Sequence, residues 1–296
     1  MTDLEKQLES RFPEVKVLKK RIAELNSLDL TTLSVSELKT KINDYFPIIN
    51  FGEVKWDSRY HLFRVRRNLN NQFDQPFESL KKIGLRPAKG TPFGRANNEN
   101  QAVFYGSNEG DLALFESCQN LHEFQRFEPQ NFTMGVWKVK ENQKLRLVPI
   151  VDSRLAKKNR PDIQKASELG DKLINEQLTS EKVKKGSKLI SNFFAEQFAK
   201  SEIKSPDDYK ISSFFSDYIK LVNDMSRVKF DGILYPSVAH KYRAENVALF
   251  PESIDKLEFV KCLSITCYNF RFDVGKLTKG IIREGKLFGT DTLVWE

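Results

Sequence analysis

Hydrophobic residues recur at two different spacings along this chain. Over the first 46 residues the apolar positions follow the three- and four-residue steps of a helix, at Leu8, Phe12, Val15, Leu18, Ile22 and Leu25. Ser34 and Glu37 form a capping-box pattern that starts a second helix, and Pro47 ends it. We therefore expect a helical N-terminal extension over residues 1–55.

From about Trp56 the spacing changes to the alternation typical of strands. Strand patterns cover residues 60–65, 102–106, 133–139, 145–150, 233–235 and 259–272. The polar turn 141–143 predicts that segments 133–139 and 145–150 pair with each other. Helical patterns cover residues 112–123 and most of 155–226, with Thr179 or Ser180 starting one helix. Strands with inserted helices predict an α+β fold over residues 56–296, with a mixed β core.

The composition narrows the class of protein. Hydrophobic residues make up 40% of the chain and charged residues 30%, which excludes a disordered protein. No apolar run is long enough for a transmembrane helix, and the first residues lack a signal pattern. A cytoplasmic protein with no membrane partner is the expectation. Three irregularly spaced cysteines predict neither a disulfide framework nor a metal site.

The net charge of +8 raises the question of a nucleic-acid partner. Basic residues are concentrated between Arg154 and Lys204, which we interpret as a basic helical insertion. Acidic residues are interleaved with them, and no aromatic residues alternate with the lysines to stack on bases. A solvated helical face is therefore preferred, and nucleic acid is not an expected partner.

Three arginines are candidates for anion binding. In the segment 61–67, Arg64 and Arg66 alternate with Phe63 and Val65, so they lie on the opposite face of the predicted strand. Each could bind a phosphate or carboxylate, or be an ordinary surface arginine. Arg95 follows Gly94 in a loop, where it could contact a ligand or solvent.

Three further residues are candidates for chemistry. Glu116 lies on an apolar helix, where a carboxylate needs either a task or an ion-pair partner. Tyr105 ends a strand, so its ring could stack on a flat ligand or belong to the core. Ser237 has no nucleophile-elbow pattern around it and is interpreted as a hydrogen-bonding group.

These segments, taken in order, resemble the RES-domain family over roughly residues 58–275. The matching pieces are Phe63 to Arg66, Gly94-Arg95 with Asn97, Phe104-Tyr105, Ala113 to Glu116, and Asp231 to Ser237 with Asn246 to Phe250. Ala96 departs from the pattern, which usually has an aromatic residue there. The resemblance implies an ADP-ribosyltransferase-like fold. It also implies that Arg64, Glu116 and Ser237 are catalytic and that Tyr105, Arg66, Arg95 and Asn246 bind substrate.

The same resemblance implies a function. Family members are toxins of bacterial toxin–antitoxin pairs that degrade NAD, so NAD would be the substrate, with no further cofactor. The bond between nicotinamide and ribose would be cleaved by hydrolysis or phosphorolysis, and a cognate antitoxin protein would be the partner. Two alternatives stay open: transfer of ADP-ribose to a macromolecule, and a non-enzymatic module that binds nucleic acid.

Overall fold

The chain forms two compact units. The computed structural model describes residues 9–47, 49, 51–68, 76–85, 88–117, 129–150, 168, 172, 180–237, 245–271 and 276–296. The helical unit comprises residues 1–54, 92–99 and 148–235, and the sheet unit comprises residues 55–91, 100–147 and 236–296. The N-terminal helices thus share a unit with helices from the middle of the chain. The sequence predicted a single boundary at residue 55, whereas each of these two units is made of three segments of the chain.

The helical unit is built from amphipathic helices whose starts the sequence indicates. Among the described residues, its helices are α2 (Val15–Asn26), α3 (Val35–Tyr45), α8 (Glu181–Phe198), η2 (Pro206–Tyr209) and α9 (Lys210–Met225). The capping box at α3 is confirmed, because the Glu37 amide donates to Ser34 Oγ at 3.2 Å and the Ser34 amide donates to Glu37 Oε2 at 2.9 Å. Ser180 is the residue that precedes α8, as predicted.

The core of the helical unit is aromatic. Phe193, Phe194 and Phe198 lie on one face of α8 and are almost wholly buried. The ring of Phe194 lies 4.9 Å from that of Phe215 on α9, and the ring of Phe193 lies 5.5 Å from that of Phe46 after α3. Edge-on and tilted ring pairs add to the free energy gained by burial. This packing connects the end of α3 to α8 and α9, which lie far from it in the sequence.

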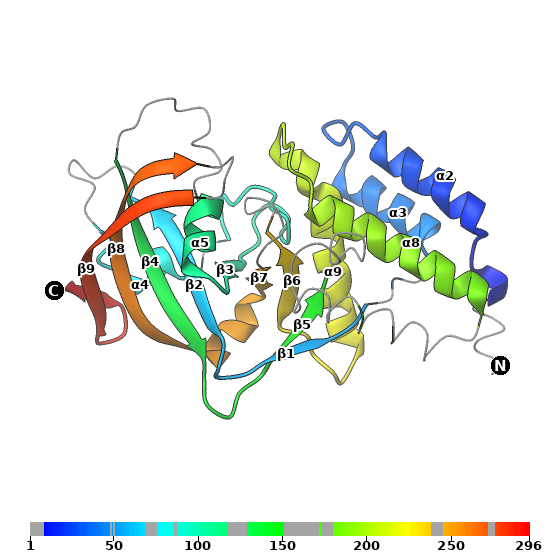
Figure 1. Cartoon of the computed structure of the whole chain (residues 1–296). Helices are drawn as coiled ribbons and strands as arrows, with labels where there is room; N and C mark the ends of the chain where they lie inside the picture. The colour runs from blue at the N-terminus through cyan, green and yellow to red at the C-terminus, as the bar shows by residue number, and fades with distance from the viewer. Residues whose placement is uncertain are drawn as a thin grey trace. The chain divides into compact units, whose positions relative to one another are not determined.

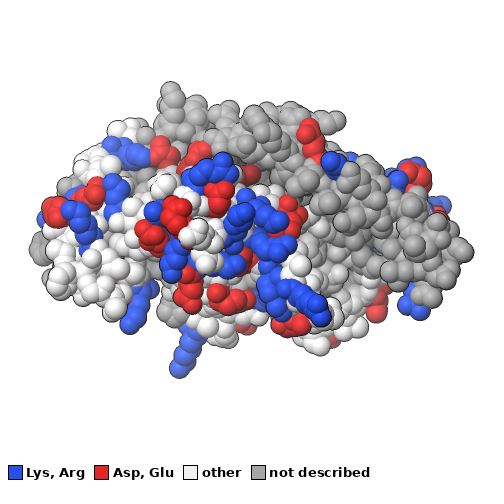
Figure 2. Space-filling view, turned by 90° about the horizontal axis from the view of Figure 1, so that it is seen from below, with Lys and Arg blue, Asp and Glu red and all other residues white. Residues whose placement is uncertain are grey.

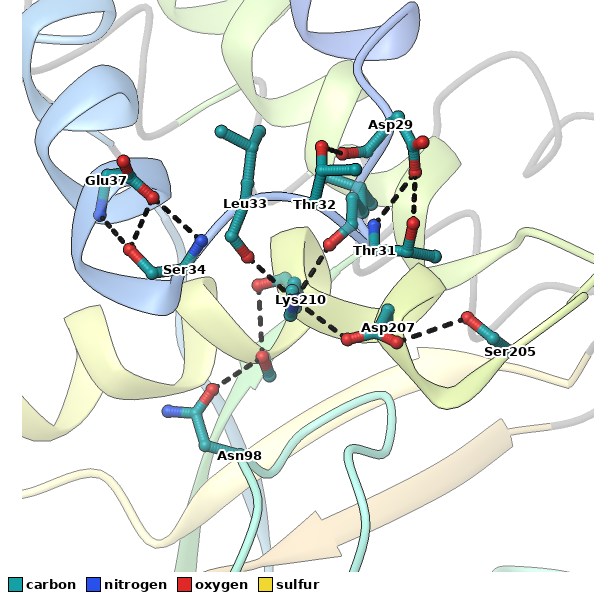
Figure 3. Close-up of polar contacts among 12 residues, drawn as sticks. Asp29, Thr31, Thr32, Leu33, Ser34, Glu37, Asn98, Ser205, Asp207 and Lys210 are labelled. Carbon is teal, nitrogen blue, oxygen red and sulfur yellow. Dashed lines mark hydrogen bonds and ion pairs between the residues drawn. The ribbon is translucent and has the colours of Figure 1, made fainter.

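A buried lysine fastens the segment between α2 and α3 to α9 (Figure 3). Lys210 Nζ donates to the backbone oxygens of Leu30 and Leu33, both at 2.8 Å, and lies 2.7 Å from Asp207 Oδ1. The residue is only 8% exposed. Burying an ammonium group is costly unless its protons are donated in hydrogen bonds, and here three acceptors surround it. The N-terminal helices are therefore an integral part of the helical unit.

The sheet unit is an antiparallel sheet in the order β7-β3-β2-β4-β8-β9-β10 (Figure 1). These strands are β2 (His61–Arg67), β3 (Phe104–Ser107), β4 (Gln130–Val139), β7 (Glu245–Leu249), β8 (Leu257–Arg271), β9 (Lys276–Phe288) and β10 (Thr292–Trp295). The described part of the unit also contains the short helices α4 (Leu80–Ile83) and η3 (Pro251–Lys256) and the helix α5 (Gly110–Ser117). Three more strands, β1 (Val54–Trp56), β5 (Leu145–Pro149) and β6 (Gly232–Pro236), contain or adjoin the residues at which the units divide. The predicted α+β class is confirmed.

The predicted pairing of residues 133–139 with 145–150 is wrong. Both edges of β4 are occupied by other strands, because β2 pairs with it from His61 to Arg67 and β8 from Leu257 to Cys267. In the strand order β5 lies instead between β1 and β6. The turn does form, with Asn142 at φ 63°, but it carries the chain to a different part of the sheet. Long-range pairing therefore prevails over a local turn signal.

The helix α5 packs on one face of this sheet. Its residues Ala113 and Leu114 form a buried cluster with Val65 of β2 and Met134 of β4. Since side chains alternate along a strand, Phe63 and Val65 face α5 while Arg64 and Arg66 leave β2 on the other face. The alternation proposed from the sequence is thus present in the structure.

The expected helix at 112–123 is described as α5 up to Ser117, and its remainder lies outside the described residues. Most of the basic insertion before residue 180 also lies outside them. In the part of the chain that is described, no helix has the length and apolarity needed to cross a membrane.

Candidate functional site

Glu116 lies in the last turn of α5, at an electrostatically unfavourable place for a carboxylate. Four consecutive residues before it, from Leu112 to Phe115, are buried, so the helix is held by its apolar side chains. Ser117 Oγ donates to the Ala113 oxygen at 2.9 Å at the helix end. The C-terminal end of a helix carries a partial negative charge and disfavours an acidic side chain. A carboxylate kept there needs donors from elsewhere in the chain.

Two distant residues supply these donors. Glu116 Oε1 accepts a hydrogen bond from Ser237 Oγ and a second from Asn246 Nδ2, the latter at 2.8 Å. Ser237 is fully buried and Asn246 is 5% exposed. Ser237 follows directly on β6, and Asn246 lies near the start of β7. The structure therefore brings together three of the residues predicted from the sequence, with Glu116 more than 100 positions from the other two.

In this arrangement Ser237 is a donor to a carboxylate. Its hydroxyl donates to Glu116 Oε1, so it is one of the groups that orient that carboxylate. Charge-assisted hydrogen bonds of this kind fix the orientation of a carboxylate. Glu116 is left as an oriented, partly exposed acidic group, which suits it to stabilise a positive charge or to hold a hydroxyl group.

A second polar network, which the sequence did not reveal, fixes Asn246. Ser107 lies opposite Asn246 in the register of β3 and β7, and its Oγ donates to the Glu245 oxygen at 3.0 Å. The next residue, Asn108, donates from Nδ2 to the Glu245 carboxylate at 3.3 Å. Glu245 is 7% exposed. The only signal for this network was a pair of polar residues after a strand, which ordinarily indicates a turn.

Tyr105 shares a sheet face with Asn246. The register pairs Tyr105 with Ala248 and Ser107 with Asn246, so these four side chains leave β3 and β7 on the same side. Tyr105 is half-buried. An aromatic ring on the same face as the residue that orients Glu116 is consistent with the predicted role of Tyr105 as the wall of a pocket.

Arg64 has a different environment. It is 5% exposed, its Nε donates to the Ile83 oxygen at 3.0 Å, and its Nη1 donates to the Tyr105 oxygen at 2.7 Å. Its guanidinium carbon also lies 5.3 Å from the centre of the Phe104 ring. Arg66, two residues further along β2, lies on the same face as Arg64 and opposite to α5. Binding of a dinucleotide by these two arginines stays a prediction.

Comparison with protein families agrees with this geometry. The model of the RES domain matches residues 61–265, which is more than half of the chain. The chain belongs to the RES-domain family. A search of curated proteins found no match. The RES domain has an ADP-ribosyltransferase-like fold, and membership of the family indicates an enzyme that uses NAD in general terms.

The matched residues of the RES domain include Arg95, which lies in the helical unit. Arg95 donates from Nη1 to the Phe198 oxygen at 2.7 Å and from Nη2 to the Lys200 oxygen at 2.9 Å. Its guanidinium lies over the ring of Tyr209 at 5.2 Å. The last carbonyl groups of a helix lack partners within the helix, so Arg95 caps the C-terminal end of α8. Its predicted contact with substrate stays a prediction.

The two described cysteines, Cys262 within the matched residues and Cys267 just beyond them, are not reactive groups. Cys267 is fully buried on β8, and burial raises the pKa of its thiol to about 12. Burial raises the pKa of the Cys262 thiol to about 12 as well. A thiol with such a pKa is protonated at neutral pH and is a poor nucleophile. Among the described residues, no three His, Cys, Asp or Glu side chains are grouped as a metal site would require.

Proposed function

We propose that this RES-domain protein consumes NAD by cleaving the bond between nicotinamide and ribose. The observation that carries the proposal is the carboxylate of Glu116, held by Ser237 and Asn246. When this bond breaks, its electron pair goes to the nicotinamide nitrogen and the ribose carbon becomes positively charged. A fixed carboxylate beside that carbon stabilises the charge, as in glycoside hydrolysis.

The same geometry supports a proposal for the remaining steps. Tyr105 would stack on the nicotinamide ring from the sheet face that it shares with Asn246. An oxygen of water or phosphate then forms a bond to the ribose carbon and loses its proton to solvent. Ser237 would act by orienting Glu116, because its hydroxyl donates a hydrogen bond to that carboxylate. NAD is therefore a substrate in this proposal, and no other cofactor is required.

The experiment is mass spectrometry of NAD incubated with the purified protein. Equal release of nicotinamide and ADP-ribose would indicate hydrolysis, and appearance of phosphorylated ADP-ribose only in phosphate buffer would indicate phosphorolysis. Attachment of the ADP-ribose mass to a protein or nucleic acid would identify a transferase instead. Unchanged NAD with a folded protein, in water and in phosphate, would refute the proposal.

We further propose that the protein is a toxin neutralised by a cognate antitoxin, as the family suggests. The support is the family membership rather than a described surface. Expression alone should then deplete cellular NAD, and co-expression of the neighbouring reading frame should restore it. If NAD levels stay normal when the protein alone is expressed, the toxin role is refuted.

Nucleic acid remains the less favoured partner. Figure 2 shows basic and acidic side chains interspersed on the face seen from below. In the described part of the basic stretch, Lys182 lies 3.2 Å from Glu14, Lys184 lies 3.3 Å from Glu181, and Lys200 lies 2.8 Å from Asp208. Lysines that already have acidic neighbours attract a phosphate backbone less strongly.

A further inference from the structure

The C-terminal strands β9 and β10 lie beyond the residues that match the RES domain, yet they contact its matched part. Gly289, with a φ of 66°, lies in the turn between them. On the side of β10 away from β9, the Leu293 amide donates to the Glu78 oxygen at 2.9 Å. Trp295 Nε1 donates to the Phe77 oxygen at 3.1 Å. The outer edge of β10 therefore holds the segment that leads into α4.

Asp291, in the turn before β10, caps α4 from 210 positions away in the sequence. Its Oδ1 accepts from the Lys81 amide at 2.8 Å, and its Oδ2 accepts from Ser79 Oγ at 2.8 Å. Its backbone oxygen accepts from the Leu80 amide at 2.7 Å. The residue that precedes α4, Ser79, makes no side-chain cap itself. The amide of Lys81 followed by the Ser79 hydroxyl lowers the pKa of the Asp291 carboxyl below its usual range.

The other end of α4 is held by Arg64. The oxygen of Ile83, the last residue of α4, accepts from Arg64 Nε at 3.0 Å. The same guanidinium donates from Nη1 to the backbone oxygen of Tyr105 at 2.7 Å. A guanidinium is planar, so these two donors have a fixed separation and direction. Arg64 thus connects the end of α4 to the backbone of β3 at the residue predicted to line the pocket.

We propose that Asp291, α4 and Arg64 form a brace that positions Tyr105, and that Arg64 and Asp291 are positioning residues rather than ligands of the substrate. All of these residues belong to the sheet unit. The brace itself stands on the contacts above, and its effect on catalysis rests on the proposed function. The consequence is that a segment outside the matched family residues sets the geometry of the site.

A direct test of the brace, which needs no NAD, measures hydrogen exchange of the Arg64 side chain. The Nε–H of Arg64 has its own signal in nitrogen-15 NMR, assigned by its loss in Arg64→Lys. Removing a capping side chain destabilises the helix end that it holds, so Asp291→Ala should speed exchange of this proton roughly fivefold. Asp291→Asn retains an acceptor oxygen for the Lys81 amide and should restore part of the protection. The control is Glu296→Gln, which removes a carboxylate 3.0 Å from Lys286 near the end of β10.

A kinetic test then asks whether the brace acts on the site. We expect Asp291→Ala and Arg64→Lys each to lower kcat/KM for NAD about tenfold, well outside the two- to threefold scatter of such effects, and Glu296→Gln to have no effect. The double variant should be no slower than the slower single variant, because both changes break one brace. All rates are expressed per folded molecule, measured by the thermal unfolding amplitude.

The outcomes are distinguishable. Unchanged exchange of the Arg64 Nε–H in Asp291→Ala would overturn the brace. Two results would show that Arg64 acts directly on the substrate. One is a multiplicative loss of kcat/KM in the double variant. The other is a change in the chemical shift of the Arg64 Nε–H when NAD is added to saturation, of equal size in the wild type and in Asp291→Ala. If the wild-type protein turns over no NAD, the proposed function fails, and the exchange measurement alone still decides whether the brace exists.

Discussion

Replacing Glu116 by glutamine is the sharpest test of the proposed site. The side chain keeps its shape, and its amide oxygen can still accept from Ser237 Oγ and Asn246 Nδ2. What disappears is the negative charge. The fold should therefore persist while the stabilisation of a cationic ribose is lost.

The loss of rate expected for Glu116→Gln can be estimated in two ways. A unit charge about 4 Å from a forming cation, at the effective dielectric constant of about 20 for sites near a protein surface, contributes about 4 kcal/mol. Removal of one preorganised electrostatic group from an active site costs about 100- to 1000-fold in rate. Since each 1.4 kcal/mol corresponds to a factor of ten, the two estimates agree. We expect Glu116→Gln to lower kcat at least 100-fold.

The assay is the initial rate of nicotinamide release, with circular dichroism melting as a check on the fold. Glu141→Gln is the matched control, because Glu141 is an exposed carboxylate in the turn after β4. Ser237→Ala removes one of the two donors and should cause an intermediate loss of about tenfold or more. A folded Glu116→Gln protein with a rate within about threefold of the wild type would refute the assignment. A collapse of the melting temperature would show that Glu116 is structural.

Four further outcomes can be measured. Phe194→Ala should lower the free energy of unfolding by about 3–5 kcal/mol in urea, because this ring is 1% exposed and packs on four others; a loss below about 1 kcal/mol would contradict the packing. Lys210→Met should cost about 3–5 kcal/mol in the same assay, since it leaves Asp207 and two carbonyl groups without their donor. Mobility-shift titration at physiological salt should show no sub-micromolar nucleic-acid binding, and binding weakened by reversing the charges of Lys182, Lys184, Lys185 and Lys188 would contradict this. The Asp291 carboxyl should titrate below its usual value of 3.8 in NMR, so its stabilising contribution is present at neutral pH and is lost as the pH falls through the lowered pKa.

Local signals in the sequence predicted much of the helical unit. The capping box at Ser34 and the start of α8 after Ser180 depend on residues three or four positions apart, and both formed as expected. The failed hairpin between β4 and β5 shows the limit of such signals. A turn determines that the chain reverses, but which strand it pairs with depends on competition among all strands.

The candidate site also contains residues that the sequence indicated and residues that it did not. The family pattern named Glu116, Ser237 and Asn246 because it carries information from many positions at once, and the structure joins these three side chains by hydrogen bonds. The residues that hold this group in place, Ser107, Asn108 and Glu245, had no distinguishing local pattern. Their hydrogen bonds depend on the register of β3 against β7, which joins residues more than 130 positions apart.

Arg64 shows why residue type and alternation do not suffice to assign a role. The alternation of polar and apolar residues correctly placed Arg64 on the face of β2 away from Phe63 and Val65. On that face an exposed guanidinium would bind anions, whereas the buried one here donates to two backbone oxygens. Burying a charged group against neutral carbonyl groups costs free energy, which the hydrogen bonds of the fixed guanidinium plane partly offset. In this protein Arg64 connects the end of α4 to β3, the strand that carries Tyr105, and Asp291 caps the start of the same helix.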